Sequence, residues 1–205
     1  MVCRDYQLIN IDNISKETPF THFRDLYLSA LNNSQNNIEA AAISTVCKEN
    51  KPSSRFVNIK YINNSFIFFS NYKSNKAKDL ELNKNACILF FWNNISTQIR
   101  IEGYVIKSDS IFSDDHFSQR SFSKNIAALI SNQSSIIDSH ESLLERYNNA
   151  YEASFKEDIK RPSYWGGYEL VPEIFEFWHG SDFRLNMRTK YTKQNKNWVK
   201  TFLES

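Results

Sequence analysis

The stretch RFVNIKYINNSFIFFSN, residues 55–71, decides the class of fold. Two runs rich in β-branched and aromatic residues, 55–62 and 65–71, flank the pair Asn63-Asn64. Asparagine tolerates the backbone conformations of tight hairpin turns, so this pattern predicts two antiparallel strands joined by a short turn.

Further strands are predicted on both sides of this hairpin. The segment EAAAISTVC (39–47) is small, apolar and β-branched, and ACILFFW (86–92) indicates a fully buried strand in which Cys87 is a small hydrophobe. The segment TQIRIEGYVI (97–106) alternates polar and apolar residues, which is the pattern of a strand with one buried face. After RPSYWGGYELVP (161–172) turns the chain back into strands, the last ones are predicted at about 173–178, 188–192 and 197–202.

Helices are predicted before, within and after the first group of strands. Thr18 can cap the first, with Pro19 in its first turn, and its apolar face is formed by Phe20, Phe23, Tyr27, Ala30 and Leu31. Ser74 can cap a short helix over 74–85. Ser113 can cap another, with Asp114 and Asp115 in its first turn, where negative charge suits the helix dipole. Further helical segments are predicted at 125–131 and 139–155. Antiparallel hairpins with helices set to one side predict an α+β, barrel-like domain.

Composition limits the classes of function. The chain has 205 residues, enough for one domain, and 41% of them are hydrophobic. Lys and Arg number 25 against 23 Asp and Glu, so nothing in the net charge favours a nucleic-acid partner. The three cysteines form no CxxC or Cys/His cluster, so no metal site is expected. The N-terminus has no apolar signal core and no apolar run is long enough to span a bilayer, so a cytoplasmic protein without a membrane partner is expected.

Several polar residues on otherwise apolar strands are candidates for a site, although a solvated strand face explains each of them alone. Arg55 and Lys60 are five residues apart, which puts them on opposite faces of a regular strand. Gln98 shares a polar face with Arg100 and Glu102. The segment Gln133-Ser134-Ser135 follows a predicted helix and fits an ordinary C-terminal turn.

Two groups of cations have spacings that suit an anionic ligand. His116, Arg120 and Lys124 would form a cationic stripe on one continuous helix, although the helix can break near Ser121–Ser123. Arg184 and Arg188 lie near the turn in EFWHGSDFRLNMR (176–188) and could clamp a planar anion. Within the same stretch, burial in the core is the simplest explanation of Trp178.

These pieces, in this order, resemble the pyridoxamine/pyridoxine 5′-phosphate oxidase family. The resemblance runs from about Ala40 to the C-terminus and rests on AAISTV, RFVNIK, FFSNYKSNKA, TQIRIEG, SNQSS, PSYWGGYEL and EFWHGSDFRLNMR. It implies one domain over residues 1–205, an antiparallel, Greek-key-like split β-barrel with flanking helices, preceded by a short N-terminal arm, 1–17. It also implies a homodimer with flavin mononucleotide (FMN) bound at the subunit interface.

The resemblance implies which residues hold FMN. Arg55 and Lys76 match family residues that bind the FMN phosphate, and Gln98, Trp178 and Arg188 match positions around the flavin ring system. The remaining matches to cofactor-binding positions are Phe56, Lys60, Phe69, Ser70, Asn75, Gln133 and Ser134. Two of these positions depart from the family, because Asn75 replaces a usual Arg and Phe69 replaces a common Tyr.

On the substrate side, Lys60, Arg120 and Arg184 match family residues. His116 stands where the family has Tyr, Lys124 where it has Ser, and Asn186 where it has His. By this resemblance, Arg184 and Asn186 occupy the catalytic positions. Lys60, His116, Arg120 and Lys124 would hold the anionic group of the substrate.

The implied reaction is the transfer of a hydride from an anionic aromatic substrate, such as pyridoxine or pyridoxamine 5′-phosphate, to FMN. Dioxygen then accepts the electrons and gives hydrogen peroxide. The changes at 124 and 186 and the short arm leave two alternatives open. One is the oxidation of another aromatic acid, such as a phenazine precursor. The other is a flavin- or pyridoxal-phosphate-binding protein without turnover.

Overall fold

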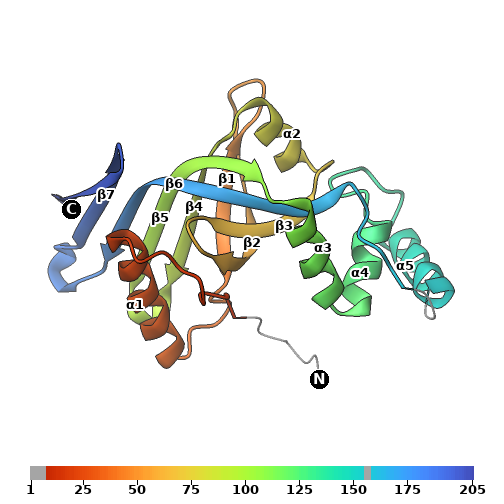
Figure 1. Cartoon of the computed structure of the whole chain (residues 1–205), viewed down its shortest axis with the longest axis horizontal. Coiled ribbons are helices and arrows are strands. Elements are labelled where there is room, and N and C mark those ends of the chain that lie inside the picture. Colours follow the sequence, from red (N-terminus) through yellow and green to blue (C-terminus); the bar gives the residue numbers. More distant parts are fainter. Residues whose placement is uncertain (1–7, 155–157) are drawn as a thin grey trace.

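The computed structural model describes residues 8–154 and 158–205 (Figure 1). Short 3₁₀ turns at Asn93–Ile95 and Asp182–Arg184 join some of its elements. In chain order the helices and strands are α1 (Thr18–Asn32), β1 (Ala40–Val46), β2 (Pro52–Ile62), β3 (Phe66–Asn71), α2 (Asn75–Leu82), β4 (Asn85–Trp92), β5 (Thr97–Lys107), α3 (Ser110–Gln119), α4 (Phe122–Ile130), α5 (His140–Ser154), β6 (Trp165–His179), β7 (Met187–Gln194) and β8 (Asn197–Leu203).

The strands form one antiparallel sheet in the order β3-β2-β1-β4-β5-β6-β7-β8, and pairing of β3 with β6 closes six of them into a barrel. The long strand β6 makes this closure, because it pairs with β5 and its first part also pairs with β3. The last part of β6 pairs with β7 instead. Figure 1 shows α3, α4 and α5 at one end of the molecule and β7 at the other. The predicted antiparallel α+β barrel is confirmed, including the hairpin at Asn63-Asn64.

The barrel has an open seam along β2. Residues 52–58 of this strand pair with β1, whereas β3 pairs with β2 only from Ile59 onward. In the described parts of the chain, the other edge of 52–58 is not covered by a strand. A bulge at Lys60 shifts the register between Ile59 and Tyr61 and lets Asn10 bridge to β2, with Asn10 N–H donating to the Lys60 carbonyl over 2.8 Å.

The core fills the barrel and continues under α1. The predicted apolar face of α1 is buried, with Phe20, Phe23, Tyr27 and Ala30 no more than 2% exposed. The ring of Phe23 contacts those of Phe66, Phe90 and Trp92 from the barrel. Aromatic side chains carry large apolar areas, so this packing fixes how the helix closes the barrel end.

Two details of the helix starts differ from the sequence prediction. Helix α3 begins at Ser110 because the Asp109 carboxylate accepts hydrogen bonds from the N–H groups of Ile111 (2.8 Å) and Phe112 (3.3 Å). The predicted cap, Ser113, is instead buried inside the helix, where its hydroxyl accepts from the Gly167 N–H over 3.1 Å. Thr18 is the first residue of α1, whose N-cap is Glu17.

The strand predictions needed two corrections. The segment 86–92 is not fully buried: Phe91 is 60% exposed and Cys87 is only partly buried, because one face of β4 points out of the barrel. Strand β6 begins at Trp165 rather than near 173. It accommodates Pro172 opposite a register shift between Glu102 and Gly103, where a Cβ on Gly103 would lie only 2.0 Å from the Val171 carbonyl oxygen.

The helices of residues 8–154 and 158–205 include none that combines the length and the apolar character needed to cross a bilayer.

Candidate active site

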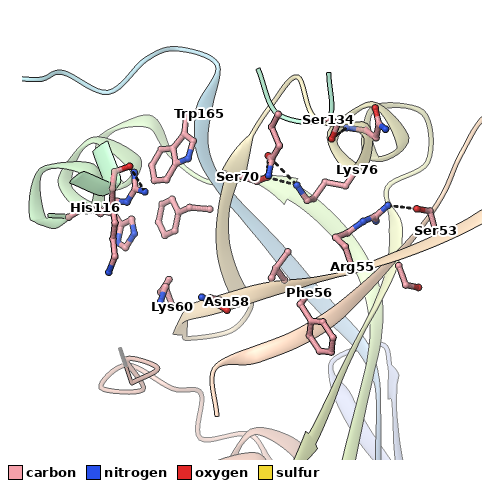
Figure 2. A pocket seen from close by; sticks show the side chains of 17 residues that line it. Ser53, Arg55, Phe56, Asn58, Lys60, Ser70, Lys76, His116, Ser134 and Trp165 are labelled. Atoms are coloured by element: carbon pink, nitrogen blue, oxygen red, sulfur yellow. Dashed lines mark hydrogen bonds between the residues drawn. The ribbon is translucent and has the colours of Figure 1, made fainter. Parts of the chain in front are cut away.

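The main pocket lies at the open seam of the barrel and has a volume of about 760 Å³, a size typical of small-molecule sites (Figure 2). The free edge of β2 forms one wall. The end of β3, the start of α2, the α3–α4 junction and the loop after α4 form the others. The lining residues are Ser53, Ser54, Arg55, Phe56, Val57, Asn58, Lys60, Phe69, Ser70, Asn75, Lys76, His116, Arg120, Lys124, Gln133, Ser134 and Trp165.

The pocket is strongly cationic. Its described lining includes five Lys and Arg side chains and no Asp or Glu. Figure 2 shows Arg55 and Lys76 on one side, and Lys60 and His116 on the other. Such a surface attracts anions, and the two separated groups can hold two anionic groups at once.

The first group, which we call the α2 cluster, consists of Arg55, Ser70, Lys76, Gln133 and Ser134. Lys76 is 7% exposed, and its Nζ donates to the Ser70 hydroxyl over 2.7 Å. Burial and, second, the charge of Arg55 lower the pKa of Lys76 to about 8. No carboxylate among the described residues pairs with this ammonium, and α2 begins one residue before it. A buried cation beside a helix N-terminus suits a phosphate group.

Arg55 is held in place by hydrogen bonds to residues of β1 and β2, with support from α2. Its guanidinium donates to the hydroxyl of Thr45 over 2.6 Å, and the Thr45 hydroxyl donates in turn to the buried carboxylate of Asp79 over 2.7 Å. A second guanidinium nitrogen donates to the Ser53 hydroxyl over 2.6 Å. Asp79 Oδ2 itself lies 3.9 Å from the guanidinium, so the charge of Arg55 is only loosely paired and remains available to a ligand.

The second group, which we call the α3–α4 cluster, consists of Lys60, His116, Arg120 and Lys124. The predicted continuous helix is broken, because α3 ends at Gln119 and α4 starts at Phe122. Arg120 therefore lies in the extended junction, where it donates to the Asn125 side chain over 3.2 Å and to the Lys124 carbonyl over 3.0 Å. The break does not separate His116, Arg120 and Lys124, all of which line the pocket.

Stacked rings form the wall beside this cluster. The imidazole of His116 stacks on Phe69 at 3.7 Å between ring centroids, and Phe69 stacks on Trp165 at 5.3 Å. The guanidinium of Arg120 lies 4.4 Å from the centroid of Trp165, within cation–π range. This packing gives a flat apolar surface next to a concentration of positive charge.

Burial, aided by the crowding of positive charge, shifts the titration of the cluster. Burial, then Arg120 and Lys60, lower the pKa of His116 to about 4, so the imidazole is neutral at pH 7. Burial lowers the pKa of Arg120 to about 10, which leaves it protonated. The pKa of Lys60 is also lowered, mainly by burial; Glu39 opposes this shift, and Lys124 and Arg120 add to it.

Twelve of the residues expected at the site meet in this pocket: Arg55, Phe56, Lys60, Phe69, Ser70, Asn75, Lys76, His116, Arg120, Lys124, Gln133 and Ser134. Arg55 and Lys60 both reach it although a regular strand would put them on opposite faces. They do so because the pocket wraps around a free strand edge and because the bulge at Lys60 interrupts the alternation of β2.

The other expected residues lie elsewhere in the subunit. Gln98, Trp178 and Arg188 are direct neighbours across β5, β6 and β7, which puts their side chains on one face of the sheet. Arg184, which is exposed, and Asn186, which is half-buried, lie in the connection between β6 and β7. None of the five lines the pocket described above.

Glu176 organises this outer face. It is 5% exposed, and its carboxylate pairs with Arg100 on β5 and with Arg188 on β7, whose Nη2 is 2.7 Å from Oε1. Arg188 also donates to the Glu204 carbonyl over 3.0 Å. The Arg188 side chain is therefore fixed on the sheet rather than free in solvent.

Sequence reasoning missed several residues at the pocket. Trp165 was noticed only within a motif, and Ser53, Asn58 and Tyr61 were not considered. Tyr61 stands behind the wall, with its hydroxyl 2.9 Å from His116 Nδ1. A register shift is not visible in strand periodicity, so the sequence offered no signal for Tyr61. The dipeptide Trp165-Gly166 was a usable signal, because glycine within a strand indicates a close approach of another group. A Cβ on Gly166 would lie 2.2 Å from the Tyr72 hydroxyl oxygen.

The protein is an antiparallel split barrel with a cationic, aromatic pocket at its open seam, an arrangement that suits an anionic small molecule. Comparisons with known proteins specify its family. The family model described as pyridoxamine 5′-phosphate oxidase matches residues 30–151. A second model, the pyridoxine 5′-phosphate oxidase C-terminal dimerisation region, matches residues 165–204. The chain belongs to the pyridoxamine 5′-phosphate oxidase family and is an oxidoreductase.

Relatives cover most of the chain. The pyridoxine/pyridoxamine 5′-phosphate oxidase of Haemophilus influenzae is 37% identical over 90% of this chain and 88% of its own length. The pyridoxine/pyridoxamine 5′-phosphate oxidase of Leptospira biflexa is 40% identical over 80% of this chain and 78% of its own length. Among solved structures, PhzG from Burkholderia lata 383, in complex with tetrahydrophenazine-1-carboxylic acid, superposes with a TM-score of 0.87 at 25% identity over 95% of both chains. A pyridoxamine 5′-phosphate oxidase-related, FMN-binding protein from Nostoc punctiforme shares the fold, with a TM-score of 0.76 at 17% identity over 93% of this chain and 100% of its own.

Proposed function

We propose that this protein is an FMN-dependent oxidase of pyridoxine or pyridoxamine 5′-phosphate, or of a closely similar anionic aromatic substrate. The observation that carries the proposal is the pocket itself, which holds two cationic clusters and an aromatic wall beside the second of them. Two anionic groups, one on the cofactor and one on the substrate, would neutralise these clusters.

The α2 cluster fits the phosphate of FMN. Lys76 and Arg55 supply charge, and Ser70 and Ser134 supply hydroxyls. At the start of α2, the Asn75 N–H donates to the Ser134 hydroxyl over 3.3 Å, so the helix N-terminus adjoins the cluster. Asn75 offers an amide where the family usually has an arginine, so we expect FMN to bind with one charged contact fewer. FMN, when bound, would supply the redox chemistry by taking two electrons from the substrate carbon and passing them to dioxygen, which gives hydrogen peroxide.

The α3–α4 cluster fits the anionic group of the substrate. Lys60, Arg120 and Lys124 are three cations that repel one another, and this repulsion adds to burial in lowering the pKa of Lys60. A phosphate dianion relieves this repulsion more fully than a single carboxylate does. This difference favours a phosphorylated substrate over an aromatic carboxylic acid.

A homodimer would complete the site. None of five expected residues lines the pocket of its own subunit: Gln98, Trp178, Arg184, Asn186 and Arg188. We therefore infer that the partner subunit presents its copies of these residues. The match of residues 165–204 to a dimerisation region supports this inference. So does the exposure of large apolar side chains in and near this region: Phe183 (94%), Leu185 (73%), Met187 (62%) and Phe202 (77%). Arg184 would then orient the reacting group and stabilise developing charge.

A second candidate is the oxidation of another aromatic acid. The likeness to PhzG, whose structure holds tetrahydrophenazine-1-carboxylic acid, and the changes at Lys124 and Asn186 favour it. A third candidate is a binding protein without turnover, which rests on the same changes.

Anaerobic mixing of the FMN-loaded protein with pyridoxine or pyridoxamine 5′-phosphate separates these functions. Bleaching of the flavin absorption, reversed by air with release of hydrogen peroxide, is the expected result. Absence of bleaching in a protein that holds FMN would overturn the vitamin substrate, and tetrahydrophenazine-1-carboxylic acid is then the next compound to test. If neither compound bleaches the flavin, Asn186→His decides whether turnover is weakened or absent, with Asn186→Gln as its control.

A further inference from the structure

His116 has an unusual setting for a histidine in a cationic pocket. Its Nδ1 lies 2.9 Å from the Tyr61 hydroxyl, and its ring stacks on Phe69. In the described chain, Nε2 has no hydrogen-bond partner, so this is the ring nitrogen left for a ligand. Tyr61 does not line the pocket but supports His116 from behind, packed at 5.1 Å against the ring of Phe112.

The charges around His116 keep it neutral. Lys60 from β2, Arg120 from the end of α3 and Lys124 from α4 line the same pocket, and the described residues place no carboxylate in it. Burial, then Arg120 and Lys60, lower the pKa of His116 to about 4. A neutral imidazole carries one N–H, and its position decides whether Nε2 donates or accepts.

The Tyr61 hydroxyl favours one of these two choices. Burial raises the pKa of Tyr61, so the phenol remains protonated. A phenol donates well, whereas its oxygen accepts weakly because a lone pair is conjugated with the ring. The unprotonated nitrogen of imidazole is a good acceptor. The favoured arrangement has Tyr61 donating to Nδ1, with the proton of His116 on Nε2.

We propose that Tyr61 is a positioning residue that fixes the tautomer of His116, so that the Nε2–H group donates a hydrogen bond to the anionic group of the substrate. The proposal rests on the proposed function for the identity of that substrate. It gives the α3–α4 cluster three charged contacts and one neutral, directional donor. The cluster then gains a contact to the anion without a fourth charge that would add to the repulsion.

The tautomer can be measured without turnover. In the FMN-loaded protein with ¹⁵N-labelled histidine, long-range proton–nitrogen NMR spectra distinguish the two tautomers. His116→Gln identifies the signal among the four histidines. We expect the Nε2–H tautomer, a shift of its Nε2 signal on adding inorganic phosphate, and a mixture of tautomers in Tyr61→Phe. An Nδ1–H tautomer in the unmodified protein, or an Nε2 signal that does not respond to phosphate, would overturn the proposal.

Kinetics give a second readout. For pyridoxine 5′-phosphate, Tyr61→Phe should raise KM about three- to tenfold, the size of one neutral hydrogen bond, and leave kcat within about twofold. In a His116→Gln background, whose amide nitrogen can occupy the place of Nε2, Tyr61→Phe should have no further effect. An equal effect in both backgrounds would mean a merely structural role and would sink the proposal.

Tyr191→Phe is the matched control. Its hydroxyl also faces a histidine, His22 Nδ1 at 3.5 Å, but neither residue lines the pocket. This variant should leave KM unchanged. If pyridoxine 5′-phosphate is not oxidised at all, the proposed substrate fails, while the tautomer and its response to phosphate still decide the role of Tyr61.

Discussion

Lys76 Nζ lies 2.7 Å from Ser70 Oγ, which joins the first turn of α2 to the end of β3 inside the pocket. This buried ammonium has hydroxyl and amide partners but no carboxylate among the described residues. An ammonium held in this way is prepared for an anion that the folded chain does not itself supply.

Lys76→Met should therefore weaken FMN binding. A charged hydrogen bond contributes about 1.5–3 kcal/mol, which corresponds to a loss of roughly 10- to 100-fold in affinity. Quenching of flavin fluorescence in a titration of the apoprotein measures it. Lys78→Met, an exposed lysine on the same helix, is the control and should change the affinity by less than about twofold. Equal affinities for both variants would contradict the assignment of the phosphate site.

FMN binding should also depend on pH through Lys76. Its pKa in the folded apoprotein is lowered to about 8, so above that pH the side chain is mostly a neutral amine. This amine must take up a proton before it can pair with the phosphate. Affinity should fall by up to about tenfold per pH unit above 8 and be flat just below it. The same shift makes the apoprotein more stable as pH rises from 8 toward the unfolded pKa of 10.5, because the unfolded state then binds more protons. In Lys76→Met, a slope in affinity that persists would show that another group titrates.

Thr45→Val should affect both stability and cofactor binding. The Thr45 hydroxyl links the guanidinium of Arg55 to the carboxylate of Asp79. Its loss leaves a buried carboxylate without that donor and should lower the free energy of unfolding by about 1–3 kcal/mol. Urea denaturation measures the loss, and flavin titration should show weaker binding as Arg55 loses its support. Thr45→Ser retains the hydroxyl and should behave nearly as the unmodified protein does; a serine variant as damaged as the valine one would refute this explanation.

Glu176→Gln should destabilise the outer face of the sheet. Glu176 is 5% exposed and balances both Arg100 and Arg188. Removal of one partner from a buried ion pair costs about 3–5 kcal/mol, and because the arginines are partly exposed we expect about 2–3 kcal/mol here. Glu102→Gln, which removes an exposed partner of Arg100, should cost less than about 1 kcal/mol in the same urea experiment. A loss at Glu102 as large as that at Glu176 would argue against the burial of Glu176 as the cause.

Much of the fold could be predicted from local pattern. Alternation over 97–106 and the hairpin at Asn63-Asn64 predicted antiparallel strands, and both are present because a half-buried strand requires a period of two. Helix starts were less certain. Asp109 and Ser113 are both good capping residues, and only the packing of Ser113 against Gly167 excludes the second.

The sequence by itself determined three features of this protein. They are the hairpin-rich antiparallel strands of the barrel, a set of cations on otherwise apolar elements, and motifs in the order of one family. Local periodicity and short motifs are properties of neighbouring residues, so they can be read in one dimension. The tertiary structure alone decided that Arg55 and Lys60 share a pocket and that a broken helix still gathers His116, Arg120 and Lys124. It also decided that Tyr61 stands behind His116. These relationships depend on a strand bulge, a helix break and an uncovered strand edge, which arise from the packing of segments far apart in the chain.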